Sequence, residues 1–169
     1  MALQRMDHVG VVVDDLDAAT AFFTELGMEL EGRTPVEGRW VDRVVGLDGV
    51  RVEIAMMRTP DGHGRIELTR FRTPAAVSAE PAHAPPHTLG IRRIMFAVDD
   101  LADVLARLRA HGAELVGEVA RYEDAYRLCY VRGPADSSSP WPSSSTDGRP
   151  GPRAGPPTGG LPIPILVLE

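Results

Sequence analysis

The chain has 169 residues, of which 43% are hydrophobic and 25% are charged, and its formal net charge is -6. This composition is sufficient for a buried core and excludes a disordered polyelectrolyte over most of the length. A negative charge without clustered Lys or Arg argues against nucleic acid as a partner. No apolar stretch reaches the roughly 20 residues that span a bilayer, and residues 1–7 lack a signal-peptide pattern. We therefore expect a cytoplasmic protein without a membrane partner.

An internal repeat organises the sequence. The segment DHVGVVVDDL, which begins at Asp7, is matched 85 residues later by RRIMFAVDDL, which begins at Arg92. The same offset carries Gly27 onto Gly112. A repeat that keeps its register over this length predicts two copies of one structural module.

Each copy begins with a predicted strand followed by a predicted helix. Val9, Val11 and Val13 alternate with residues of the opposite face, which is the period of a half-buried strand. The Asp pairs at 14–15 and 99–100 are suited to cap the helices that follow, and the glycines at 27 and 112 to end them. In the first copy, further strands are predicted at 28–32, 39–47, 50–58 and 65–71.

The predicted sheet has one face toward the helices and one open face. The helix-facing residues would be Val9, Val11, Val13, Ile66, Leu68, Ile94, Phe96 and Val98. The open face would carry His8, Gly10, Arg65, Glu67, Thr69, Arg93 and Met95. Polar side chains of this kind are typical of a wet concavity rather than a packed core.

These elements predict an α+β fold in which two tandem βαβββ modules form a cup-shaped mixed sheet. The first module would span residues 1–72 and a linker residues 73–89. The second would span residues 90–134 and would be incomplete, because no counterpart of the strand at 65–71 follows it. Residues 135–169 form a low-complexity tail, and nine of the chain's fifteen prolines fall between Pro134 and Pro164.

The tail has two interpretations. A shift of one base in the reading frame would turn its serine runs into Leu, Ile, Val or Phe, and so restore an apolar strand after Pro134. The alternative is a natural disordered extension. The one apolar run in the tail, Leu161 to Glu169, is a candidate surrogate strand, which Pro162 and Pro164 would limit to a sheet edge.

The first copy resembles the glyoxalase, bleomycin-resistance and extradiol-dioxygenase superfamily, which has the vicinal oxygen chelate (VOC) fold. The resemblance rests on the phrase that begins at Asp7, on Phe22-Phe23 and Leu26-Gly27-Met28, and on Arg65-Ile66-Glu67-Leu68, and it covers roughly residues 7–134. It implies a cup in which each module contributes one ligand from its first strand and one carboxylate from its last to a divalent metal ion.

The resemblance implies that His8 and Glu67 are the first module's metal ligands, with Glu67 also a catalytic proton shuttle. Imidazole and carboxylate suit Zn, Ni, Fe or Mn, and open positions let substrate oxygens bind and be polarised. As alternatives, His8 would be a hydrogen-bonded pocket residue and Glu67 a solvated strand residue. Arg93 stands where a second histidine is expected, and it is permanently cationic. We therefore expect the metal to be weakly bound or absent, with Arg93 paired to Glu67 or to an anionic ligand group.

Other candidate ligand-binding residues are Trp40, Arg43, Met56, Tyr122 and Tyr126, which would clamp a flat or amphipathic molecule unless they serve plain packing. Three classes of function follow. The first is a metal-dependent lyase or isomerase of glyoxalase type, or a dioxygenase-like enzyme, acting on a small molecule with vicinal oxygens. The second is a metal-free drug-binding protein of bleomycin-resistance type. A purely structural role is the third. A homodimer is expected in each case.

Overall fold

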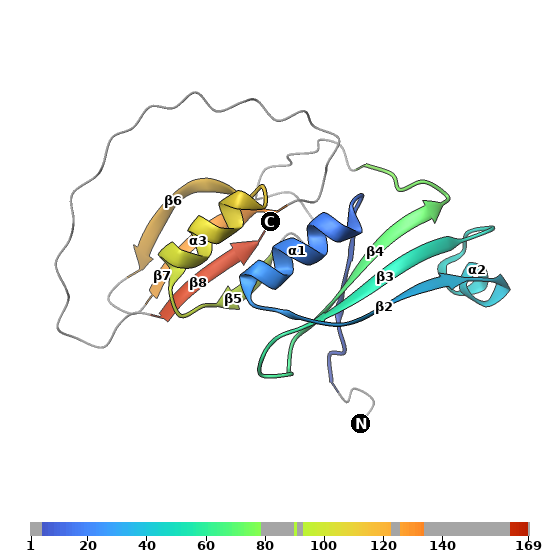
Figure 1. The fold of residues 1–169 in the computed structure, drawn as a ribbon, viewed down its shortest axis with the longest axis horizontal. Helices are drawn as coiled ribbons and strands as arrows, with labels where there is room; N and C mark the ends of the chain where they lie inside the picture. Colours follow the sequence, from blue (N-terminus) through green and yellow to red (C-terminus); the bar gives the residue numbers. More distant parts are fainter. Residues whose placement is uncertain (1–4, 79–89, 91–92, 123–125, 134–162, 169) are drawn as a thin grey trace.

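The computed structural model describes residues 5–78, 90, 93–122, 126–133 and 163–168 (Figure 1). The first module contains β1 (Val9–Val12), α1 (Leu16–Leu26), β2 (Glu29–Glu37), α2 (Arg39–Val45), β3 (Arg51–Arg58) and β4 (Arg65–Thr73). The second contains β5 (Ile94–Ala97), α3 (Leu101–Ala110), β6 (Glu114–Tyr122), β7 (Tyr126–Arg132) and β8 (Ile163–Leu168). They form two four-stranded sheets, ordered β1-β4-β3-β2 and β5-β8-β7-β6. The α+β fold of two βαβββ modules is confirmed.

The repeated Asp pairs cap the two long helices in the same way. One Asp15 carboxylate oxygen accepts hydrogen bonds from the amides of Asp17 and Ala18, both at 2.9 Å. Asp100 accepts from Ala102 and Asp103 at 2.9 and 3.1 Å. These bonds satisfy amides that have no partner within the first helical turn, so the repeated motif starts both helices at matching positions.

The segment 39–47 was predicted to be a strand, and this prediction is wrong. Residues Arg39–Val45 form the short helix α2, while β2 extends to Glu37. Glycines with positive φ stand on both sides of α2, Gly38 at 109° and Gly46 at 72°. The carboxylate of Asp42 accepts a hydrogen bond from the Val50 amide at 2.7 Å, which ties the helix to the start of β3. The adjacent apolar residues of this segment suggested a buried strand. In the structure only Val41 of α2 is buried.

The candidate surrogate strand in the tail supplies the last strand of the second module, so the prediction that the module lacks this strand is corrected. Residues 163–168 fill the fourth position as β8, between β5 and β7, rather than at the sheet edge that we expected. Pro164 is tolerated because β5 pairs only with residues 165–168, so that Pro164 lies beyond the end of β5 and faces Arg127 of β7 alone. The other tail residues, 134–162 and 169, lie outside the described part of the chain.

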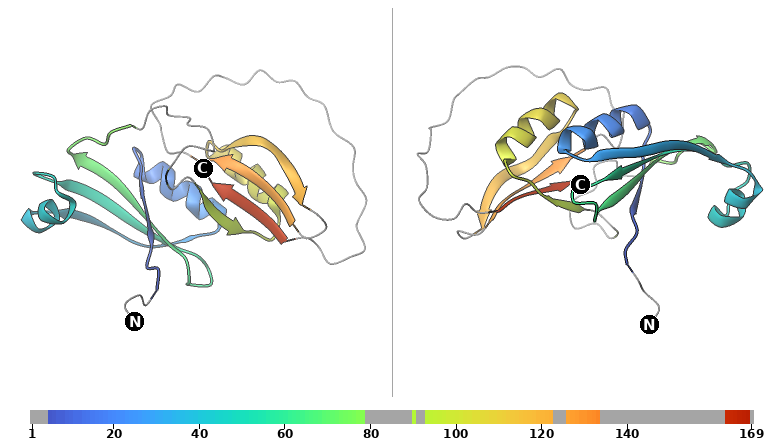
Figure 2. Two further views of the ribbon diagram at one scale, coloured as in Figure 1. Left: turned by 180° about the vertical axis from the view of Figure 1, so that it is seen from behind. Right: turned by 60° about the horizontal axis from the view of Figure 1, so that its bottom comes forward.

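One apolar core joins the two modules. Helices α1 and α3 lie side by side and cover the same side of the two sheets (Figure 2). Buried side chains from both helices and from β3, β4 and β7 form a single cluster, which includes Phe22, Met57, Leu68, Leu101, Leu108 and Val131. The guanidinium of Arg107 on α3 also contacts the carbonyl and the carboxylate of Glu25 on α1. No helix in the described residues has the length and apolarity to cross a bilayer.

Because the core is shared, damage in one module should be felt in the other. Leu108 is fully buried, so Leu108→Ala is expected to lower the free energy of unfolding by about 2–5 kcal/mol. Hydrogen exchange should then report lost protection in β4 of the first module as well as in β7. The control, Arg109→Ala, alters an exposed position of the same helix and should change stability by no more than about 0.5 kcal/mol. Unchanged protection in β4 would show that the modules unfold independently.

Cys129 offers a chemical probe of this packing. Its side chain is buried in β7, and burial raises the pKa of the thiol, against a smaller opposing effect of Arg127. Because the thiolate is the reactive form, the native protein should react slowly with iodoacetamide at pH 8 and quickly after unfolding in urea. Equal rates in both states would contradict the packing of β7 against the shared core.

Candidate functional site

His8 and Glu67 lie close together on the face of the first sheet that points away from α1. Strand β1 pairs in parallel with β4, and this register places Gly10 opposite Glu67. Because side chains alternate along a strand, His8 projects on the same side as Glu67, while Val11, Ile66 and Leu68 project toward the core. The imidazole Nε2 of His8 is 3.9 Å from a carboxylate oxygen of Glu67. The two residues predicted from sequence are thus brought together.

Two further residues orient this pair. The carboxylate of Asp7 is 3.0 Å from Nδ1 of His8, and the hydroxyl of Thr69 donates to Glu67 at 3.0 Å. In neutral imidazole, a hydrogen bond from Nδ1 to Asp7 leaves the lone pair on Nε2, on the side of Glu67. The hydrogen bond from His8, with a further one from Arg5, lowers the pKa of Asp7, so the carboxylate that accepts from His8 stays charged. The imidazole of His8 therefore lies between two carboxylates, that of Asp7 at Nδ1 and that of Glu67 near Nε2.

His8 and Glu67 are open to solvent, with charged side chains on one side of them along the sheet and apolar side chains on the other. The side chains of His8 and Glu67 are 36% and 27% exposed. On one side lies a charge-balanced cluster, in which Arg65 contacts Glu31 at 3.0 Å and Arg58 contacts Glu29 at 2.7 Å. On the other side an apolar cluster under α2 is made by Val36, Val41, Val50, Val52, Ile54 and Phe71. Met56 is the register neighbour of Glu67 on β3 and shares its face.

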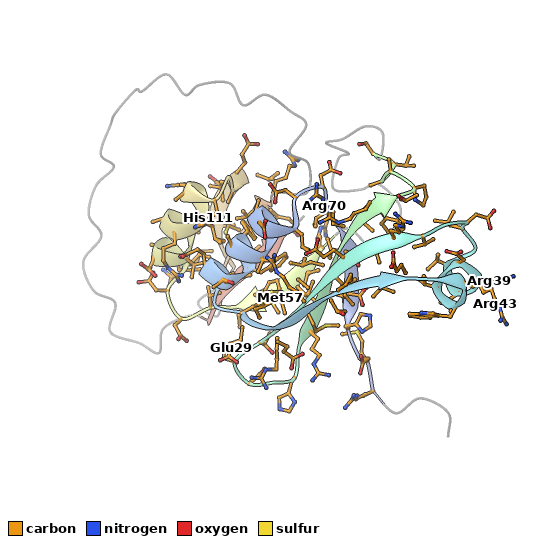
Figure 3. All side chains as sticks on the ribbon, turned by 45° about the vertical axis from the view of Figure 1, so that its right-hand side comes forward. Glu29, Arg39, Arg43, Met57, Arg70 and His111 are labelled. Carbon is orange, nitrogen blue, oxygen red and sulfur yellow. The ribbon has the colours of Figure 1, made fainter. Side chains whose placement is uncertain are left out.

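Trp40 and Arg43, which we predicted to bind ligand, lie elsewhere. Both are on α2, where Trp40 is 62% exposed. Figure 3 shows α2 at one end of the first sheet, far from Glu29. A hollow of about 460 Å³ opens beside this helix, lined by Glu37, Gly38, Arg39, Asp42, Gly49, Val50, Arg51 and Thr73. Thr73 is six residues along β4 from Glu67, which corresponds to roughly 20 Å of strand.

The second module presents different chemistry at the matching positions. Arg93, the repeat partner of His8, lies over the ring of Tyr130, 5.0 Å from its centroid. The repeat partner of Gly10 is Met95, and Met95 pairs with Val167 of β8. Val167 therefore stands at the register position that Glu67 has in the first sheet, and no carboxylate is found there. Tyr122 and Tyr126 pair with each other in β6 and β7, but their side chains lie outside the described part of the structure.

These residues do not fit the metal site that the resemblance implies. One imidazole and one carboxylate are available in the first module, whereas Arg93 and Val167 hold the corresponding places in the second. Within the described residues, no group of three or more His, Cys, Asp or Glu side chains is arranged to hold an ion. A guanidinium and a valine supply no ligand, so half of the expected donor set is missing.

Sequence reasoning missed Asp7 and Tyr130. An acidic residue beside a histidine is a usable signal, because its carboxylate can reach Nδ1, but the repeat drew attention only to His8. Tyr130 had no such signal, because its contact with Arg93 joins residues of β7 and the start of β5. The hollow beside α2 was missed because that segment was predicted to be a strand.

Comparison with known proteins agrees with this architecture. A family model described as the glyoxalase/bleomycin resistance protein/dioxygenase superfamily matches residues 5–137. The uncharacterized protein YwbC of Bacillus subtilis (strain 168) is 30% identical over 134 residues, covering 78% of this chain and 90% of YwbC. The crystal structure of a glyoxalase family protein from Bacillus cereus is 46% identical, with a TM-score of 0.76, and the match covers 99% of this chain and 97% of that one. The chain belongs to the glyoxalase/bleomycin resistance protein/dioxygenase superfamily.

Proposed function

We propose that this protein binds a small molecule on the open face of its first sheet, anchored by His8 and Glu67, without a resident metal ion. The observation that carries the proposal is the contrast between the two modules. The first presents an oriented imidazole and carboxylate, and the second has Arg93 and Val167 at the matching positions. A metal ion that requires ligands from both modules would have only those of the first module, His8 and Glu67.

The separation of the anchor atoms suits a ligand group between them. At 3.9 Å, Nε2 of His8 and the oxygen of Glu67 are too far apart for a direct hydrogen bond. An ammonium group placed between them would donate to both Glu67 and Nε2, whereas a hydroxyl would donate to one of the two. Asp7 and Thr69 hold the two acceptors in place before the ligand arrives, which reduces the entropy lost on binding.

The surroundings of the anchor favour an amphipathic ligand. Met56 and the cluster that contains Ile54 and Phe71 offer apolar surface to one side of Glu67. Arg93 carries a permanent positive charge and lies over the ring of Tyr130, and a guanidinium is chemically matched to an anionic or aromatic ligand group. We propose Arg93 as the second module's contribution to binding, in place of a metal ligand.

A metal-dependent enzyme of glyoxalase type is the second candidate. The observation in its favour is the contact of Asp7 with Nδ1 of His8, since metal-ligating histidines usually donate their other ring nitrogen to a carboxylate or carbonyl. His8 and Glu67 would hold the ion, which would supply Lewis acidity toward a substrate oxygen. Glu67 would move the proton. The missing donors of the second module weigh against this candidate.

Metal content separates the two candidates. Purified protein, dialysed extensively and analysed by elemental spectrometry, is expected to contain far less than one Zn, Ni, Fe or Mn ion per chain. The reason is that two donors with an arginine in the second module bind a divalent ion weakly. One tightly held ion per chain that is lost in both His8→Ala and Glu67→Ala, but retained in His63→Ala, would support the enzyme instead.

Ligand binding tests the anchor directly. Bleomycin, a catechol and a glutathione hemithioacetal should be titrated calorimetrically in the presence of a chelator. For any that binds, His8→Ala and Glu67→Gln should each weaken affinity by about tenfold, the loss of roughly 1.4 kcal/mol of hydrogen bonding. Glu53→Gln is the matched control, because Glu53 has a similar exposure of 28% but lies on the helix-facing side of β3.

Two results would count against the proposal. One is binding that survives both substitutions, which would place the ligand elsewhere, for example in the hollow beside α2. The other is the failure of all three compounds to bind unless a divalent ion is added.

A further inference from the structure

The hollow beside α2 is separate from the site that holds His8 and Glu67. It has a volume of about 460 Å³ and lies at the end of the first sheet. There Glu37, Arg51 and Thr73 are register neighbours on β2, β3 and β4. Pockets that bind small molecules typically measure about 300 to 1,000 Å³. The hollow is therefore large enough for a ligand of its own, and the proposed function makes no use of it.

Two guanidinium groups line this hollow and are available to a ligand. Arg39 forms no hydrogen bond or ion pair with any residue that the structure describes. Arg51 has only a loose partner, because its Nε is 3.5 Å from a carboxylate oxygen of Glu37 and both side chains are largely exposed. A guanidinium binds the oxygens of a phosphate or carboxylate through paired N–H groups. An anionic group that enters the hollow would thus meet one unpaired cation and one weakly held cation.

Two carboxylates on the same walls limit how much negative charge the ligand can carry. One oxygen of Asp42 accepts a hydrogen bond from the amide of Val50 at 2.7 Å, and the other accepts none within the described part of the chain. Glu37 also lines the hollow. Carboxylates accept hydrogen bonds from hydroxyl groups and repel a second anion. The ligand should therefore combine one anionic end with hydroxyl groups.

The indole of Trp40 lies at the rim of the hollow. A Cβ atom added to Gly38 would be 3.7 Å from Cδ1 of this indole, and Gly38 itself lines the hollow. Trp40 is 62% exposed, so most of its surface is open to contact with a ligand. An indole in this position offers a flat apolar face, on which a heterocyclic base can stack.

We propose that the hollow beside α2 binds a mononucleotide. The phosphate would be held by Arg39 and Arg51, and the base would stack on Trp40. The sugar hydroxyls would donate to Asp42 and Glu37. Stacking uses the face of a base rather than its edges, so the site should distinguish little between bases. This inference does not rest on the proposed function, because the hollow shares no residue with the anchor on the open face.

AMP serves as the probe for this site. Its binding to the full-length protein is measured by calorimetry and by the fluorescence of Trp40, with Trp141→Phe removing the chain's other tryptophan. AMP should bind and quench Trp40. Adenosine and inorganic phosphate should each bind at least about tenfold more weakly, because each lacks either the charged or the stacking contact.

Two arginines on the same helix supply a matched pair of variants. Arg39→Gln removes a guanidinium that lines the hollow and should weaken AMP binding by about tenfold. Arg43→Gln makes the same change one turn along α2, at an exposed position outside the lining (Figure 3), and should alter affinity by no more than about twofold. Both positions are exposed, so neither substitution should affect folding.

The contribution of the indole is tested separately. Trp40→Ala should weaken AMP binding by about tenfold, whereas Trp40→Phe should retain most of the affinity because a phenyl ring also stacks. Affinities of these two variants are compared by calorimetry, and His8→Ala should bind AMP as the unmodified protein does.

Four results would overturn the proposal. They are the absence of saturable AMP binding below about 10 mM, equal losses of affinity in Arg39→Gln and Arg43→Gln, binding of adenosine or phosphate as tightly as AMP, and loss of AMP binding in His8→Ala. The last result would place AMP on the open face of the first sheet, so that failure of this site is distinguishable from failure of the proposed function.

Discussion

The parallel pairing of β1 with β4 determines most of what the first module can do. These are the first and last strands of the module, and their pairing attaches β1 to the sheet formed by β2, β3 and β4. The same register brings His8 beside Glu67, although the two are far apart in sequence. The positions of His8 and Glu67 on the open face are tied to the packing of the core. A shift of either strand by one residue would turn Val11 or Leu68 away from the core. The site is therefore a by-product of the packing on the opposite face.

In the second module the shared core is kept, but the open-face pair of ligand residues is not. Its helix, its first strand and β7 keep their places, and Leu108 and Val131 complete the shared core. The strand opposite β5 nevertheless comes from a distant segment and runs in reverse. Backbone pairing is restored by such a segment, but a carboxylate at the position of Glu67 is not. The fold can therefore be kept without all of the metal ligands. This chain has the whole fold but only half of the expected ligands.

The sequence predicted the features that depend on local patterns. The repeated Asp-Asp, the alternation around Val11 and the pairing of His8 with Glu67 on one face follow from strand and helix periods. Helix α2 was missed because adjacent valines suit both a strand and a short helix, and the choice is made by Gly38, Gly46 and the bond from Val50 to Asp42. The inner place of β8 was missed because it depends on where β5 ends, a tertiary fact that no local pattern encodes. The contact of Asp7 with His8 was within reach of sequence reasoning and was overlooked.

The shared core between α1 and α3 also bears on how the protein can evolve. Residues on the open face, such as Glu67 and Met56, contribute little to the cluster that holds the modules together. Substitutions there change recognition at small cost in folding free energy, whereas those at Phe22 or Leu108 would affect both halves at once. A cup built on one common core can thus alter its two walls separately, so that a binding surface and an ion-binding surface are a few open-face substitutions apart.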